Sequence, residues 1–581
     1  MGCIVLWCGV MKSIHVGNRR SFFPQGLVFL KVLLILLACL WIYAPVFHGE
    51  WLWDDDYLLT NNPAMSSVEG LWGIWFSPAT ADYLPITLTA LWIQWRFFGM
   101  DSTGYHIASV LLHATGACLV WLLFHRLKIR FAWVGGLIFA IHPLCVESVA
   151  WVSEIKNTLS LPFFLLAAIG YVRFEENAQR RDYFMALFFF LAAMLSKSSV
   201  VMFPVLILLY AWWKRGRVEG RDILRSAPFF LISLGLGLIT LFFQLGRAIG
   251  SEPIPIGAWD SRLAIAGMAV LFYISKIFWP VNLLPIYPQW AANPPSPTQF
   301  IPLLVIGAGL GLFWIYRKTW GRHALIGFGF FLITLLPVLG FVPMSYMRVG
   351  WVSDHFLYLP MIGIVGWSVA GAGRVYQEAS PFFKPVVIAL SILVGVVLME
   401  STRSYAEIWQ NEDRMWLHTM KYNWNCWQAH NRFGSRLFNR GNFDEALKHF
   451  IVATELRPDL AETQNNLGSA VLAQKDTKGA IKHFREGLRL SPEIIDIKGN
   501  LAQALFLDGQ YLEALPLYKE LAAKFPKKAA LQCNLGVVEY QLGNFDASVR
   551  AFQQALVIDP NLKDAKGNLD KVLRDLKKSE H

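Results

Sequence analysis

The feature that most constrains this chain is a series of apolar blocks between residues 27 and 400. A helix needs about 20 apolar residues to cross a bilayer. We therefore predict an all-α protein with a polytopic transmembrane domain at 27–400 and about eleven crossings, of which 262–280 is the weakest. The blocks lie at about 27–47, 104–124, 131–149, 157–174, 183–196, 199–213, 227–246, 262–280, 299–316, 323–343, 356–372 and 385–400.

Basic residues indicate how the chain crosses the membrane. Lys12, Arg19 and Arg20 precede the first block, and short basic loops follow at 125–131 and 214–222. Cytoplasmic loops are enriched in Lys and Arg, so residues 1–26 are predicted to be a cytoplasmic segment. The net charge of +11 lies mainly in such loops, which argues against a nucleic-acid surface.

No cleavable signal is predicted at the N-terminus, because its first apolar stretch is long enough to remain as an anchor. The seven cysteines are scattered without metal-ligand spacing, so neither a disulfide framework nor a zinc site is predicted.

A repeat of 34 residues begins near Trp427 and is typical of tetratricopeptide repeats, each of which is a pair of helices. Four copies at 427–562 predict an α-solenoid that binds an extended peptide or another protein. Residues 563–581 are predicted to be a capping helix, and 401–426 a linker. The positions in register are Pro458, Pro492, Pro526 and Pro560; Gly441, Lys475, Gly509 and Gly543; Ala446, Ala480, Ala514 and Ser548; and Phe450, Phe484, Tyr518 and Phe552.

Three consecutive aspartates, Asp54 to Asp56, follow the first apolar block between Trp53 and Tyr57. Like charges this close raise a pKa unless a cation or a substrate shares the site, and charges at membrane level are costly and usually functional. A solvated loop remains the alternative. Further polar side chains are expected on the same outer face, namely His142, Glu147, Glu154, Lys156, Lys197, Arg348 and His355.

The order of these motifs resembles a known family. The stretches are a W-D-D on the first outer loop, "YLPITLTALWIQW", "HPLCVESVAWVSEIKNTLS", "LSKSSVVMFP" and "DHFLYLPMIGI", followed by the repeats. Together they resemble bacterial multi-pass proteins with C-terminal tetratricopeptide repeats. Those proteins are similar to the transmembrane, tetratricopeptide-containing O-mannosyltransferases, which look like GT-C glycosyltransferases.

The resemblance implies a GT-C-like core that takes its sugar from a polyprenyl-phosphate-linked donor. Asp54 and Asp55 match the acidic pair that supplies the catalytic base. The predicted phosphate-binding residues are Lys156, Lys197, Arg348 and His355, and the predicted acceptor- or substrate-positioning residues are Trp53, Tyr57, His142, Glu147 and Glu154.

The chain departs from the family pattern at Cys145, Ile155, Asn157 and His355. Two of these departures, Ile155 and His355, stand where the family pattern has arginines. The phosphate contacts expected of those arginines would then be made by Lys156, Arg348 and His355.

The predicted reaction moves the sugar, with inversion, to a hydroxyl on the outer side, expected to belong to Ser or Thr of a protein. The expected partners are the lipid-linked donor, a protein acceptor, and membrane lipid, without nucleic acid. No cofactor is required, and no metal site is assigned, although the aspartates could hold a divalent ion.

Three alternatives remain open from the sequence. One is a membrane-anchored scaffold for an envelope, pilus or secretion assembly, and another is a glycosyltransferase acting on a lipid or a cell-wall glycan. A transporter is disfavoured because its polar residues would lie at mid-membrane depth. The predicted location is a bacterial inner membrane with the aspartates and repeats on the periplasmic side; the endoplasmic reticulum is the alternative.

Overall fold

The computed structural model describes residues 25–77, 82–249 and 254–579, which form helices and no β-strand. The all-α prediction is confirmed. The predicted N-terminal segment, 1–26, lies almost wholly outside the described residues. The chain divides into two compact units, Met1–Met415 and Trp416–His581.

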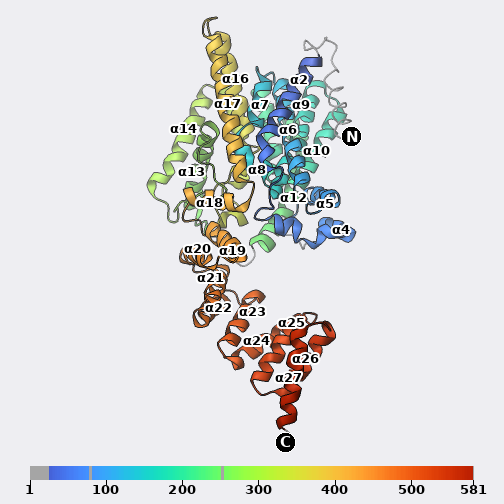
Figure 1. Ribbon diagram of the computed structural model, residues 1–581. Helices are drawn as coiled ribbons and strands as arrows, with labels where there is room; N and C mark the ends of the chain where they lie inside the picture. Colours follow the sequence, from blue (N-terminus) through green and yellow to red (C-terminus); the bar gives the residue numbers. More distant parts are fainter. Residues whose placement is uncertain (1–24, 78–81, 250–253, 580–581) are drawn as a thin grey trace. The chain divides into compact units, whose positions relative to one another are not determined.

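The first unit is a bundle of helices of very different lengths (Figure 1). They are α2 (Gln25–Tyr43), α3 (Pro63–Ser66), α4 (Val68–Phe76), α5 (Pro85–Phe98), α6 (Thr103–Arg126), α7 (Ala132–Ala140), α8 (Val146–Ala150), α9 (Ile155–Asn177), α10 (Arg180–Ser196), α11 (Phe203–Arg215), α12 (Gly220–Phe243), α13 (Trp259–Phe278), α14 (Ile301–Ile315), α15 (Gly321–Leu335), α16 (Met361–Glu378) and α17 (Lys384–Ile408).

Eight helical segments within the described residues are long and apolar enough to cross a membrane. The bent pair Ala132–Ala140 and Pro143–Ala150, with an angle of 56°, makes up to nine if it counts as one span. The predicted blocks at 183–196 and 199–213 correspond to α10 and α11, whose 17 and 13 residues fall short of the length of a full span. The count of about eleven crossings therefore stays a prediction.

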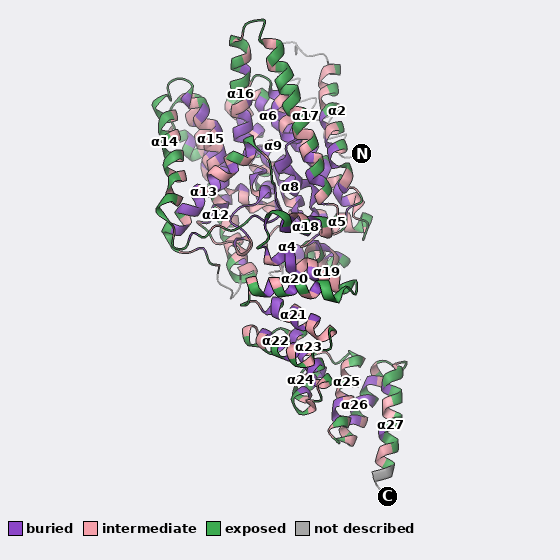
Figure 2. Cartoon of the chain, turned by 60° about the vertical axis from the view of Figure 1, so that its left-hand side comes forward, coloured by how far each residue is buried: buried purple, intermediate pink, exposed green. Residues whose placement is uncertain are grey.

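The core of this unit lies around α6, α8 and α9 (Figure 2). All five residues of α8 are buried, whereas α14 buries none of its residues. An apolar helix with no buried side chain needs an apolar surrounding, which a bilayer supplies. The outer helices α14 and α17 therefore suit contact with lipid.

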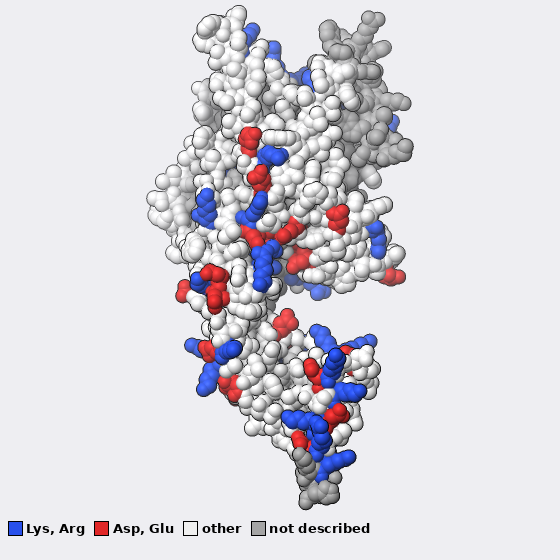
Figure 3. Space-filling view, in the orientation of Figure 1, with Lys and Arg blue, Asp and Glu red and all other residues white. Residues whose placement is uncertain are grey.

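The bundle has two chemically different ends. At one end, which we call the basic side, Arg215 and Arg225 both bind Glu175, at 2.7 and 3.0 Å, and so tie α11 and α12 to α9. At the other end, which we call the aspartate side, Asp55 of the loop at 47–62 bonds to Ser153 just before α9, and Asp82 bonds to Gln244 just beyond α12. On the face shown in Figure 3, the charged side chains visible at the upper end of this unit are Lys and Arg.

The second unit is a series of antiparallel helix pairs. The described helices are α18 (Glu412–Tyr422), which straddles the boundary between the units, then α19 (Trp427–Asn439), α20 (Phe443–Leu456), α21 (Ala461–Ala473), α22 (Thr477–Leu490), α23 (Ile495–Leu507), α24 (Tyr511–Lys524), α25 (Ala529–Gln541), α26 (Phe545–Ile558) and α27 (Lys563–Ser579). The segment predicted as a linker, 401–426, is thus largely helical, and a helix lies at the predicted cap.

Two sequence signals of the repeats have direct physical causes. A Cβ added to Gly468 would lie 2.8 Å from the Phe484 ring, so glycine lets the two helices of the repeat approach closely. Between the helices, Gly441, Gly509 and Gly543 adopt positive φ angles of 84°, 79° and 78°. Lys475 occupies the same position with φ 66°, so the register inferred for it is confirmed.

Candidate active site

The aspartate-bearing loop is held in an unusual conformation. Trp53 has φ +46°, a left-handed value that a bulky side chain rarely adopts. Its ring stacks on Trp151 at 5.1 Å, and its backbone N–H donates to Glu412 Oε1 at 2.8 Å. Surrounding contacts must hold such a conformation, and it is often found at functional sites.

The structure gives the three aspartates different environments. Asp55 is 1% exposed, whereas Asp54 and Asp56 are exposed. Asp55 Oδ2 accepts from Leu52 N at 2.8 Å, while Oδ1 accepts from Ser153 N at 2.8 Å and from Ser153 Oγ at 2.5 Å. Both oxygens of Asp55 therefore fasten the loop, and Asp54 is left facing outward.

Burial raises the pKa of Asp55 from its ordinary value of 3.8 to about 7, although the hydrogen bonds from Ser153 and Leu52 oppose that shift. The neighbouring Asp54 carboxylate adds a smaller increase to the Asp55 pKa.

Glu154 brings two lysines together at the start of α9. Its Oε1 lies 2.7 Å from Lys156 Nζ, and its Oε2 lies 3.8 Å from Lys197 Nζ. Asn157 donates to Glu154 Oε2 at 2.5 Å and accepts a hydrogen bond from Lys197. One buried carboxylate thus holds two ammonium groups beside the aspartate loop.

A second buried cluster lies around Glu147. Its Oε1 lies 2.8 Å from His355 Nδ1, and its Oε2 accepts from His355 N at 2.9 Å. Ser353 Oγ contacts both carboxylate oxygens, at 3.0 and 2.9 Å. A buried charge requires such partners, and here they join α8 to the segment that precedes α16.

Asp354, next in sequence, accepts hydrogen bonds from Tyr287 at 2.8 Å and from Tyr405 at 3.3 Å. Burial, and then the nearby Glu147 carboxylate, raise the pKa of Asp354 well above its usual range.

The remaining predicted site residues are distributed more widely. His142 is buried, with Nε2 3.0 Å from Ile277 O, while its Nδ1 accepts from Leu144 N at 3.3 Å. Arg348 Nη2 donates to Ile249 O at 2.5 Å. Tyr57 is 61% exposed. Most of the predicted site residues therefore lie around Asp55, Glu154 and Glu147, whereas His142 is bonded mainly to backbone and Arg348 donates to the backbone of Ile249.

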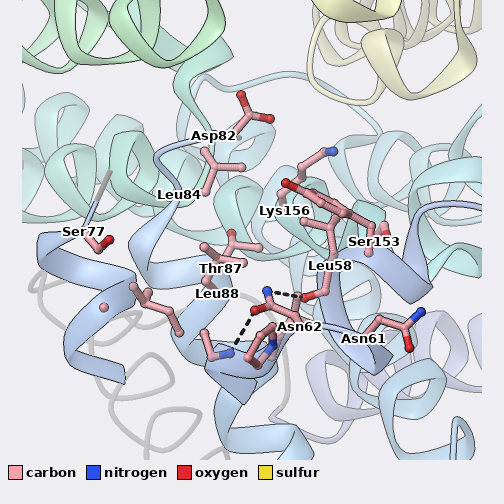
Figure 4. Close-up of a pocket in the computed structure, with 16 residues that line it drawn as sticks. Leu58, Asn61, Asn62, Ser77, Asp82, Leu84, Thr87, Leu88, Ser153 and Lys156 are labelled. Carbon is pink, nitrogen blue, oxygen red and sulfur yellow. Dashed lines mark hydrogen bonds between the residues drawn. The ribbon is translucent and has the colours of Figure 1, made fainter. Parts of the chain in front are cut away.

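A cavity of about 430 Å³ opens beside this cluster (Figure 4). Its polar lining comes from the aspartate loop, from the segment before α5 and from the start of α9. The lining residues are Tyr57, Leu58, Asn61, Asn62, Pro63, Ala64, Gly73, Ile74, Ser77, Asp82, Leu84, Thr87, Leu88, Leu91, Ser153 and Lys156.

Sequence reasoning missed three residues of this site. Ser153 bonds Asp55, Asp82 lines the cavity, and Gln244 donates a hydrogen bond to Asp82. Ser153 directly precedes Glu154, a predicted site residue, and this position is the sequence signal that could have identified it. Asp82 and Gln244 are 162 residues apart, and nothing in either local pattern indicates that they meet.

The departures from the family pattern have local explanations in the packing. Cys145 is buried and its thiol donates to Phe139 O at 3.4 Å. Ile155 is fully buried in an apolar cluster with Leu59 and Leu91, where an arginine would lack a partner. Asn157 and His355 are both bonded within the carboxylate clusters described above.

Over the described ranges, no group of three or more His, Cys, Asp or Glu side chains is arranged to hold a metal ion.

Comparison with known proteins matches two regions of the chain to known families. Residues 85–243 match the dolichyl-phosphate-mannose-protein mannosyltransferase family, and 431–493 and 500–562 match the tetratricopeptide repeat. The resemblance inferred from the sequence is confirmed. One chain combines a mannosyltransferase-type segment with C-terminal tetratricopeptide repeats.

Similar proteins include protein O-mannosyl-transferase F38B6.6 of Caenorhabditis elegans, 22% identical over 77% of this chain and 66% of that protein. The mouse protein O-mannosyl-transferases TMTC3 and TMTC4 are 22% and 23% identical over 73% and 74% of this chain, and over 50% and 66% of their own lengths. The chain thus spans about half to two thirds of these relatives.

Among solved structures, the tetratricopeptide-repeat protein YrrB, described as having an unusual peptide-binding site, aligns with 28% of this chain and 84% of its own. The TM-score is 0.26 and the sequence identity is 20%.

The pKa of Asp55 predicts a pH dependence of stability. Because the pKa of Asp55 is higher in the folded than in the unfolded state, protonated Asp55 adds to the free energy of unfolding. This contribution is complete below pH 3.8 and is lost as the pH rises through about 7. The thermal stability of the wild type relative to Asp55→Asn should therefore fall across this window, by at most about 1.4 kcal/mol per pH unit. Asp56→Asn, at an exposed neighbour, should follow the wild type. Parallel stability curves for wild type and Asp55→Asn would contradict this assignment.

Proposed function

We propose that the protein is a membrane glycosyltransferase that moves a sugar from a polyprenyl-phosphate donor to a Ser or Thr hydroxyl of a protein. Homology to proteins named as O-mannosyl-transferases supports the reaction class. The observation that carries the proposal is an exposed carboxylate, Asp54, beside a buried carboxylate that holds two lysines.

Asp54 is the proposed general base and Asp55 the proposed positioning residue. Asp55 uses both carboxylate oxygens on Leu52 and Ser153, whereas Asp54 is exposed at the head of the same turn. A base must lie within hydrogen-bond reach of the proton that it removes, which an acceptor hydroxyl can achieve only at an accessible carboxylate.

The proposed chemical step is a single displacement. The acceptor hydroxyl gives its proton to Asp54 as its oxygen bonds to the anomeric carbon. The bond from that carbon to the phosphate oxygen breaks on the opposite face, and its electron pair leaves with the polyprenyl phosphate, so the configuration inverts. Phosphate is a weak base and needs no general acid, but it needs charge compensation, which we assign to Lys156 and Lys197.

Glu154 has a positioning role in this mechanism. By pairing with Lys156 at 2.7 Å and lying 3.8 Å from Lys197, it holds both ammonium groups before the donor arrives. Preorganised charge costs no reorganisation at the moment of reaction. His355 and Glu147 form a buried support behind this group, and Arg348 stays a candidate for donor binding at the end of α12.

The donor is expected to enter from the lipid. Helix α4 exposes Val68, Trp72 and Phe76, at 69%, 70% and 67%, with a spacing of four residues. Residues four apart share one face of a helix, and an apolar face with Trp suits the membrane interface. The same helix contributes Gly73 and Ile74 to the cavity wall.

The test of the catalytic assignment compares three single variants of adjacent residues. With labelled polyprenyl-phosphate mannose and a Ser/Thr-rich peptide, Asp54→Asn should lower the transfer rate about 100-fold or more, because it removes the base. Asp55→Asn should lower the rate about tenfold through loss of positioning, and Asp56→Asn should leave it unchanged.

Mass spectrometry of the peptide detects the added hexose. If Asp54→Asn transferred the sugar at the wild-type rate and Asp55→Asn were inactive, the general base would be Asp55 and not Asp54. Absence of transfer by the wild type to any peptide, with transfer to a lipid or glycan instead, would overturn the protein acceptor.

The proposed orientation puts the aspartate side outside the cytoplasm and the basic side within it. Residues just before the repeat unit bond to the aspartate loop, through Gln410 O to Glu50 N at 2.8 Å and Glu412 to Trp53. The repeats are therefore proposed to follow on the outer side, where they can bind an acceptor polypeptide.

Cysteine labelling in intact cells tests this orientation. The five cysteines in the described part of the chain are buried, so replacing Cys3 and Cys8 should give a low background. An impermeant maleimide should then label Asp101→Cys on the aspartate side and Lys566→Cys in the repeats, but not Lys128→Cys after α6. Labelling of Lys128→Cys alone would reverse the orientation, and an unlabelled Lys566→Cys would contradict eleven crossings.

A further inference from the structure

The cavity beside the aspartate loop has the dimensions of a small-molecule site. Its volume of about 430 Å³ falls within the range of about 300–1,000 Å³ found for ligand pockets. That space can take a single sugar ring together with an incoming side chain, whereas a folded acceptor cannot enter it.

The cavity wall has an apolar part and a polar part. Ile74, Leu84, Leu88 and Leu91 supply aliphatic surface, while amide, hydroxyl and charged groups lie around it. A hexose has matching features, because its ring carries C–H groups on its faces and hydroxyls at its edge. The chemical character of the cavity therefore suits a neutral sugar better than a lipid tail or an ion.

Several polar groups of the lining are bonded within the protein. Thr87 Oγ1 donates to Ser196 O at 2.8 Å, and Ser153 Oγ donates to Asp55. Asn62 Nδ2 donates to Leu58 O at 3.1 Å, and its Oδ1 accepts from Ala64 N at 3.0 Å, as drawn in Figure 4. These side chains shape the cavity wall, and the charged side chains that line it are Asp82 and Lys156.

Asp82 is positioned from a distant part of the chain. Gln244, beyond the end of α12, donates its amide to Asp82 Oδ1, and Ser345 N donates to Gln244 Oε1 at 3.3 Å. Lys156 lies close enough to both Asp54 and Asp82 to interact with the two carboxylates electrostatically. Lys156 and Asp82 thus both line the cavity, and Lys156 is also near the proposed base.

We propose that this cavity binds the sugar ring of the lipid-linked donor, with Asp82 accepting hydrogen bonds from the ring hydroxyls. This inference rests on the proposed function and identifies the residue that selects its sugar. The anomeric carbon and its phosphate lie toward Lys156 and Asp54, and the hydroxyls on the far side of the ring reach Asp82. Because Asp82 is a carboxylate, the site takes a neutral hexose and repels a uronic acid.

The test compares binding of two lipids that differ only in the sugar. The probes are polyprenyl-phosphate mannose and bare polyprenyl phosphate, measured by equilibrium binding to the full-length protein in nanodiscs. Asp82→Asn should weaken binding of the mannose lipid about tenfold, because hydrogen bonds to a charged acceptor are strong, and leave binding of the bare lipid undiminished. Lys156→Gln should weaken both.

Asp260→Asn is the matched control, since Asp260 is an exposed carboxylate on α13 that does not line the cavity. Undiminished binding of bare polyprenyl phosphate also shows that Asp82→Asn is folded. Equal affinities of wild type and Asp82→Asn for the mannose lipid, or equal losses for both lipids, would overturn the sugar site.

The same measurement separates this inference from the proposed function. Wild-type protein that binds neither lipid would contradict the lipid-linked donor itself. If the wild type binds both lipids with equal affinity and an acceptor peptide occupies the cavity instead, the lipid-linked donor is retained and the cavity is assigned to the acceptor.

A second readout uses sugar selectivity. Asp82→Asn should reduce the preference of the wild type between lipids that carry mannose and its C4 epimer talose, because these sugars differ in the direction of a hydroxyl on the far side of the ring, which Asp82 is proposed to bind. An unchanged preference would contradict the role of Asp82 in selecting the sugar.

Discussion

The contact between Asp55 and Ser153 is the interaction on which the site depends. It fastens the loop after the first membrane helix to the start of α9, with hydrogen bonds to Ser153 N at 2.8 Å and to Oγ at 2.5 Å. Ser153 immediately precedes Glu154, the carboxylate that holds Lys156 and Lys197. The proposed base and the proposed phosphate-binding charges are therefore fixed relative to each other through two consecutive residues.

The two ends of the helical unit suit different tasks. On the basic side, Glu175 binds Arg215 and Arg225 in a network that ties three helices together. On the aspartate side, helices end early or break, as at His142–Pro143, and irregular backbone forms the site. Non-helical backbone in a membrane protein is tolerated where it is buried in protein or lines a cavity, which describes the buried segments at Asp55 and at His142–Pro143.

Much of the fold could be predicted from the sequence because its signals are local. Apolar length indicated most of the helices, and the 34-residue period fixed the repeat register, including Lys475 in a glycine position. The crossings through α10 and α11 are harder to predict, because these helices are short and their depth depends on neighbouring helices.

The candidate site could be predicted only in outline. Residue types and spacing indicated that acidic and basic groups would gather near one face, and the resemblance supplied their expected roles. The sequence could not distinguish Asp54 from Asp55, because which of two adjacent aspartates turns inward depends on the folded backbone. Asp82 was missed for a related reason, because its partner Gln244 comes from a helix end far along the chain.

The proposed mechanism requires a lipid-linked sugar to lie between Asp54 and the Lys156–Glu154–Lys197 group. An electron cryo-microscopy map of the protein with bound polyprenyl-phosphate mannose tests it most directly. We expect phosphate density against the Lys156 and Lys197 ammonium groups, with the anomeric carbon facing Asp54. Phosphate density elsewhere, with these lysines still paired only with Glu154, would contradict it.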